Sequence, residues 1–104
     1  MNAKRNSPDQ LETIRISLQV REILNVLERE RTTNDRLLST WLGKLGLGIS
    51  SRALNELLDR LDKEELVRTE NVEEVRVVHL RLFGEEVARG LETLDWIARP
   101  ELPD

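Results

Sequence analysis

The 104-residue sequence contains no cysteine, no tyrosine, one histidine and one phenylalanine. Without cysteine the chain can form neither a disulfide nor a thiolate zinc site, and cysteine-based catalysis and redox sensing are excluded as well. The one histidine, His79, cannot supply a multi-histidine metal site within a single chain. We therefore expect a protein that holds neither a metal nor a cofactor.

Long apolar runs and catalytic motifs are also missing. No apolar run approaches the roughly 18 residues that a membrane helix needs, and the first ten residues lack the apolar middle of a signal peptide. No nucleophilic triad, phosphate-binding loop or paired-carboxylate site stands out, because the acidic residues are spread over predicted helix faces. The sequence therefore predicts a cytoplasmic protein that has no membrane contact and is not an enzyme.

The chain does have enough apolar side chains for one packed domain. Leucine, isoleucine, valine and phenylalanine make up nearly a third of it, well above the ~20% below which charged chains tend to stay disordered. Charged residues make up 35% and the net charge is −4, so the chain as a whole lacks the basic footprint of a nucleic-acid-binding domain. We expect a flexible arm over residues 1–8, a folded domain over 9–99 and a frayed tail over 100–104.

The first helix is expected to cover about residues 9–31, because Ser7 and Pro8 form a typical helix start. Its core stripe has helical spacing and consists of Ile16, Val20, Ile23, Leu24 and Leu27. A second apolar stripe lies on roughly the opposite side and consists of Leu11, Ile14 and Leu18. The N-terminal half of this helix is therefore apolar on two sides, and the side that does not face the core needs another surface to pack against.

Two more helices are expected to be joined by a tight turn. Thr33 or Asn34 caps the second helix, and Gly46 closes it in the left-handed conformation. Ser50-Ser51 offers the next cap, for a third helix over about residues 51–63. Two such helices, the second of them amphipathic, match a helix-turn-helix.

The pattern changes after the third helix, where β-branched residues partly alternate along 66–70 and 75–82. We expect a hairpin of two strands there, then Gly84, which stops the second strand, and a last helix from about Glu85 to Ala98. The expected fold is mainly α with a small β-hairpin. Its order of helix, helix, helix, strand, strand, helix is that of a winged helix-turn-helix.

Three segments carry a family resemblance: Gly46 with Ile49-Ser50, Leu66-Val67, and the distinctive stretch Gly84–Gly90. Through them the chain resembles small winged-helix proteins of Mu-like phages and prophages, and more distantly the ArsR and MarR types of bacterial regulator. This resemblance implies a phage-borne regulatory or accessory protein without enzymatic activity.

Arg52 and Asn55 are the strongest candidates for base contacts, because arginine pairs with guanine and asparagine with adenine in the major groove. Both lie near the N-terminal end of the third helix, which is the end that usually enters the groove. The rest of the predicted DNA-binding set consists of Ser51, Arg60, Lys63, Arg76, and Lys4 and Arg5 in the arm.

Two acidic features favour an alternative function, in which the domain binds a protein instead of DNA. Glu56 and Asp59 share the exposed face of the third helix with its basic residues. Glu73-Glu74 places carboxylates at the hairpin tip, where a DNA-binding wing normally offers lysine or arginine. The sequence thus predicts a DNA-binding transcriptional regulator, and it leaves open a winged-helix module that binds a host or phage protein instead.

A homodimer is expected because one three-helix core leaves little surface to cover all the apolar side chains, and an uncovered patch usually marks an interface. The predicted interface joins the first and last helices and consists of Leu11, Ile14, Leu18, Leu91, Leu94 and Trp96. In the alternative, the last helix folds back onto the stripe of the first and the chain stays a monomer. Trp41 is interpreted as a core residue and His79 as a half-buried packing residue.

Overall fold

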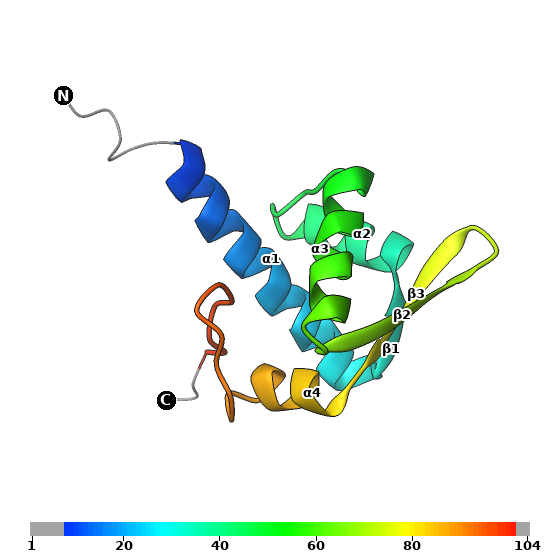
Figure 1. The fold of residues 1–104 in the computed structure, drawn as a ribbon. Coiled ribbons are helices and arrows are strands. Elements are labelled where there is room, and N and C mark those ends of the chain that lie inside the picture. The colour runs from blue at the N-terminus through cyan, green and yellow to red at the C-terminus, as the bar shows by residue number, and fades with distance from the viewer. Residues whose placement is uncertain (1–7, 102–104) are drawn as a thin grey trace.

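The computed structural model describes residues 8–101, and within this range the chain folds into four helices and three strands (Figure 1). In chain order they are α1 (Pro8–Glu30), β1 (Thr32–Asn34), α2 (Asp35–Lys44), α3 (Ser51–Lys63), β2 (Val67–Val72), β3 (Val75–Leu80) and α4 (Leu82–Ala88). The prediction of a mainly helical fold with a β-hairpin is confirmed, whereas the predicted number of strands is wrong because β1 adds a third. Lys4 and Arg5 of the predicted arm lie outside the described residues.

Side chains cap α2 and α3 where the sequence predicts. Asn34 Oδ1 accepts a hydrogen bond of 2.9 Å from the Leu37 amide at the start of α2. Ser50 Oγ accepts one of 3.1 Å from the Ala53 amide at the start of α3. Gly46 follows α2 with a φ of +78°, the left-handed conformation that ends many helices. These local predictions are confirmed, and of the two caps considered for α2 it is Asn34 that acts.

Strand β1 is the element that the sequence does not predict. Its three residues are too few to show an alternating pattern, and the sequence indicates only a break there. Thr33 pairs with Val78 of β3, and both side chains are buried. Strand β3 therefore lies in the middle of the antiparallel sheet, in the order β1-β3-β2.

The core lies between α1, α2, α3 and one face of the sheet. Its fully buried large side chains include Val20, Ile23, Leu24, Leu27, Leu38, Leu42, Leu58, Leu61, Leu66, Val67 and Val78. Trp41 does not belong to it, contrary to the prediction, because Leu38 and Leu42 take the inner side of α2. The N-terminal half of α1 extends past the other elements (Figure 1), and its second stripe stays exposed.

The last helix is shorter than predicted. Helix α4 ends at Ala88, and the chain turns at Gly90, whose φ is +82°. Residues 91–101 then run as turns beside α1, where Arg21 donates from Nε to the Ala98 carbonyl at 2.8 Å. Gly84 does not stop the second strand as predicted, since it is a buried residue inside α4.

Candidate nucleic-acid interface

The structure brings Ser51, Arg52, Asn55 and Arg76 together on the face that α3 shares with the β2–β3 hairpin. Of these, Arg76 is held most firmly, because its side chain is only 15% exposed. Its guanidinium lies 2.8 Å from Asp59 Oδ1 and donates to Thr69 Oγ1 at 2.9 Å. Arg76 thus fastens the hairpin to α3, a role that the sequence does not reveal because its partners lie in other segments.

Asn55 is engaged at both ends of its side-chain amide. Nδ2 donates to the Ser51 carbonyl at 3.1 Å, and Oδ1 accepts from Arg76 at 3.2 Å. An asparagine that recognises adenine uses the same two amide atoms in a bidentate contact. Adenine recognition by Asn55 would therefore first have to break both of these hydrogen bonds.

Arg52 is the accessible member of the predicted base-reading pair. Its side chain is 90% exposed in the first turn of α3, and Nε lies 3.5 Å from Glu56 Oε2. Exposed pairs of this kind contribute only about 0.3–0.5 kcal/mol, so a partner could displace Glu56 at little cost. Ser51 beside it is exposed as well.

Arg60 and Trp96 cover each other within one chain. The Arg60 guanidinium stacks 3.6 Å from the centroid of the Trp96 ring, and its Nε lies 3.1 Å from Glu64 Oε2. The indole Nε1 of Trp96 donates to Glu64 Oε1 at 3.1 Å. This packing places the Trp96 ring against α3, so the ring is not left for a partner. It also engages the Arg60 guanidinium with Trp96 and Glu64 instead of a DNA phosphate. Lys63 lies exposed at the far end of α3.

Carboxylates dominate the rest of the face. Asp35 at the start of α2 accepts from the Arg76 amide at 3.1 Å. At the hairpin tip Glu74 lies 3.4 Å from the guanidinium of Arg36, and Glu73 is exposed beside it. The acidic side chains here are Asp35, Glu56, Asp59, Glu73 and Glu74, and the basic ones are Arg36, Arg52 and Arg76. Each of these guanidiniums already faces a carboxylate.

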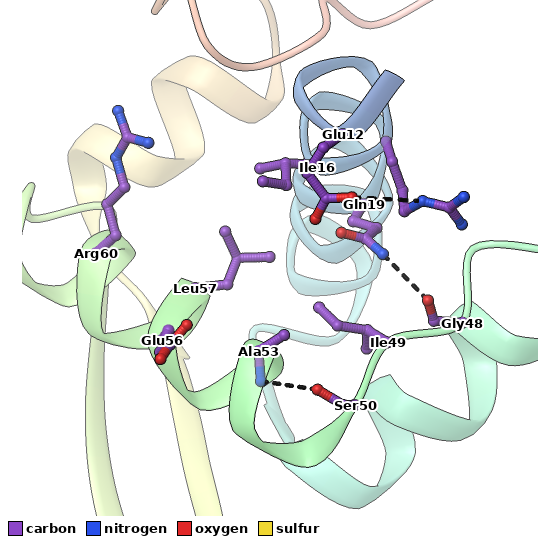
Figure 2. Close-up of a pocket in the computed structure, with 11 residues that line it drawn as sticks. Glu12, Ile16, Gln19, Gly48, Ile49, Ser50, Ala53, Glu56, Leu57 and Arg60 are labelled. Carbon is purple, nitrogen blue, oxygen red and sulfur yellow. Dashed lines mark hydrogen bonds and ion pairs between the residues drawn. The ribbon is translucent and has the colours of Figure 1, made fainter. Parts of the chain in front are cut away.

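A pocket of about 550 Å³ lies between α1 and α3 (Figure 2). Ile16, Ile49 and Leu57 give it an apolar lining. Gln19 closes one side by donating to the Leu47 and Gly48 carbonyls at 3.1 and 3.3 Å. Its charged rim consists of Glu12, Arg15, Glu56 and Arg60. Sequence reasoning misses this pocket because packing, not spacing, brings the two helices together.

Among residues 8–101, no group of three or more histidine, cysteine, aspartate or glutamate side chains is arranged to hold a metal ion. Within the same range no helix has the length and apolar character needed to cross a membrane.

His79 lies in a polar row across the three strands. His79 Nε2 lies 2.8 Å from Glu70 Oε2 on β2, and Nδ1 lies 3.1 Å from Thr32 Oγ1 on β1. The neutral Nε2–H tautomer satisfies both contacts, because it donates to the carboxylate and accepts from the hydroxyl. The interpretation of His79 as a half-buried packing residue fits this arrangement.

This row predicts a pH-dependent contribution of Glu70 to stability. The hydrogen bond from His79 lowers the pKa of the Glu70 carboxyl below its ordinary value of 4.5. Because folding lowers this pKa, the stabilisation is present above pH 4.5 and is lost as the pH falls through the folded-state value. Urea midpoints should therefore show Glu70→Gln less stable than wild type at neutral pH, with the difference shrinking at acid pH. Glu92→Gln, at an exposed carboxylate, is the control, and a difference that does not depend on pH would contradict the assignment.

The predicted dimer residues fall into two groups. Leu11, Ile14, Leu18 and Leu91 are exposed, whereas Leu94 and Trp96 are partly buried against their own core. The packing predicted in the alternative, with the last helix folded back onto the stripe of α1, is wrong, because the stripe stays exposed. The interface predicted from the two chain ends therefore loses Leu94 and Trp96, which already pack within their own chain.

Comparison with known proteins assigns no family: no family model matches the chain, and no curated protein or solved structure is significantly similar to it. The resemblance to phage winged-helix proteins accordingly stays a prediction.

Proposed function

We propose that the chain is a winged-helix domain. The observations in support are the short connection between α2 and α3 at residues 45–50, the packing of α3 beside the β2–β3 hairpin, and the sheet order β1-β3-β2. Strand β1 enlarges the sheet without changing the order of the three helices and the hairpin. In this proposal α3 is the recognition helix and the hairpin is the wing.

We infer that this domain acts by binding a protein, of the host or of a phage, and does not read DNA. The observation that supports this is the excess of carboxylates over guanidiniums on the face of α3 and the wing. Phosphate contacts supply most of the affinity of DNA-binding domains, and they need an excess of basic groups. Here the acidic side chains would instead meet the phosphates.

The proposal is tested by reversing charge at the wing tip. The double variant Glu73→Lys/Glu74→Lys raises the net charge from −4 to zero and leaves the buried core untouched. In a fluorescence-anisotropy titration with random-sequence duplex at about 50 mM salt, we expect no saturable binding by wild type and salt-dependent binding by the variant. Saturable binding by wild type, with a steep salt dependence, would contradict the proposal.

A matched control separates the position of the charge from its amount. Glu92→Lys/Glu101→Lys makes the same change in net charge at exposed residues of the C-terminal segment that do not adjoin Trp96. We expect it to bind duplex more weakly than the wing variant. Equal binding by both double variants would mean that total charge, and not the wing, governs the interaction.

Sequence-specific DNA binding is the second candidate, and the exposure of Arg52 favours it. A guanidinium at the start of a recognition helix is well placed for guanine. If the protein regulates transcription, Arg52→Ala should weaken binding to a selected duplex by about 1–3 kcal/mol and relax its specificity. Arg89→Ala, which removes an exposed arginine outside this face, is the control, and unchanged specificity in Arg52→Ala would exclude this residue from base reading.

A further inference from the structure

Two exposed apolar patches have no cover within the described chain. The first is the α1 stripe, formed by Leu11, Ile14 and Leu18, whose residues are 65%, 55% and 43% exposed. The second is the α2 groove, where Leu37, Trp41 and Leu45 follow one another at intervals of one helical turn and are 62%, 38% and 40% exposed. Soluble domains rarely leave two such patches open, and patches of this kind usually mark interfaces.

The α2 groove has depth as well as exposure. A cavity of about 290 Å³ lies between α2, β1 and the C-terminal end of α1, with Val26, Thr33, Leu37 and Trp41 in its wall. A cavity lined in this way fits apolar side chains that project from one face of a helix, as in helix-in-groove recognition. The α1 stripe is a helix face of that kind.

The stripe and the groove lie on one side of the same helix. Arg29, which lines the groove, comes 18 residues after Leu11, and at 3.6 residues per turn this is five turns, so both residues point the same way. At 1.5 Å per residue they are about 27 Å apart along α1. If two copies place their α1 helices antiparallel, the stripe of each copy therefore meets the groove of the other.

The two patches also differ in the charges beside them. Glu12 follows Leu11 of the α1 stripe and has Arg15 as its basic neighbour, whereas Arg29 and Lys44 line the α2 groove together with one acid, Glu30. Within residues 8–101 neither Arg29 nor Lys44 forms an ion pair or a side-chain hydrogen bond. Glu12 has only a loose pair, 3.9 Å from Arg15. In the antiparallel arrangement Glu12 of one copy therefore lies toward Arg29 and Lys44 of the other.

We propose that two copies of this chain form a two-fold dimer in which each α1 stripe occupies the α2 groove of the partner. Such a dimer uses both patches of both copies, so the assembly closes and does not continue into a filament. It replaces the interface predicted from the chain ends, because Leu94 and Trp96 already pack on their own chain. No residue of α3 or of the wing lines the α2 groove, so this proposal does not depend on the proposed function.

The oligomeric state tests this proposal. In sedimentation equilibrium at micromolar concentration we expect twice the chain mass of 12.1 kDa for wild type. Ile14→Asp in the stripe and Leu37→Asp in the groove, both at exposed positions, should each weaken association at least tenfold, whereas Leu91→Asp should not. Circular dichroism confirms that each variant is folded. A monomeric wild type would overturn the proposal, and so would a dimer broken by Ile14→Asp but not by Leu37→Asp.

Mixing the variants shows whether stripe and groove meet each other. A mixture of Ile14→Asp and Leu37→Asp can form a heterodimer with one intact contact, between the stripe of the Leu37→Asp chain and the groove of the Ile14→Asp chain. We expect the mixture to associate more tightly than either variant alone. Charge exchange gives a second readout, because Glu12→Lys and Lys44→Glu should each weaken the dimer and their combination should restore it. No gain in either experiment would overturn the pairing of stripe with groove.

Discussion

Replacing Gly84 with alanine is expected to lower the free energy of unfolding by about 1–3 kcal/mol, although alanine is the better helix former. Gly84 lies in α4 where the helix crosses the start of β2. An added Cβ would overlap the Leu66 carbonyl oxygen and would come within 2.9 Å of Leu80 Cδ1. Because the overlapping atom belongs to the backbone, α4 would have to move away from the sheet. Urea denaturation of wild type and variant measures the loss.

Gly43 provides the matched control. It is also a helical glycine, and a Cβ there would meet nothing within 4 Å. Gly43→Ala should therefore stabilise the protein by roughly 0.5–1 kcal/mol, through helix propensity alone. If Gly84→Ala behaved in the same way, the close approach of α4 to Leu66 would be wrong.

Replacing Arg21 with methionine is expected to cost about 2–4 kcal/mol, because it leaves the carbonyls of Ala88 and Ala98 without a donor. Arg21 is only 6% exposed, and burial lowers the pKa of its guanidinium. It donates to the carbonyls of Ala98 at 2.8 Å, Ala88 at 3.0 Å and Val87 at 3.2 Å. The carbonyls of Val87 and Ala88 form the C-terminal end of the α4 helix dipole, which favours a cation. Arg21 thus joins α1, α4 and the C-terminal segment.

The control for this variant is Arg99→Met, which removes an exposed arginine from the same segment and should change stability by less than about 0.5 kcal/mol. Urea midpoints at neutral pH compare the two. Arg21→Lys is a second comparison: a lysine keeps the charge but cannot span three carbonyls, so we expect a loss of stability there too. A fully stable Arg21→Met protein would show that the segment is held by its apolar contacts alone.

Local chemistry made the helix ends predictable. Asn34 and Ser50 cap helices through hydrogen bonds to amides three residues ahead, and Gly46 ends α2 through its own φ. Such signals depend on neighbours in sequence, so a single chain displays them. The core stripe of α1 was predictable for a related reason, since helical spacing alone identifies the buried side.

Contacts between distant segments were not predictable in this way. Strand β1 exists because Thr33 finds a partner in β3, and Trp96 is covered because α3 presents Arg60 to it. Gly84 looked like a strand stop, but what it provides is space for another segment. In each case the deciding neighbour is far away in the sequence, where spacing carries no information.

The candidate interface shows the same limit. The sequence identifies Arg52, Asn55 and Arg76 as suitable for DNA from their chemistry and position. Whether these side chains can contact DNA depends on what they already bind within the chain. The Arg76 guanidinium contacts Asp59 and Thr69, and it also donates a hydrogen bond to Asn55 Oδ1. The acidic residues that looked like solvated charges therefore determine which basic groups a ligand can reach.

The most direct test of the central claim is an amide chemical-shift titration of the wild-type protein with duplex DNA at low salt. The account predicts no localised, saturable shifts at residues 51–55 of α3 or at 73–76 of the wing, because carboxylates surround the guanidiniums there and would repel the phosphates. Saturable shifts confined to these two segments, and lost at about 200 mM salt, would contradict it.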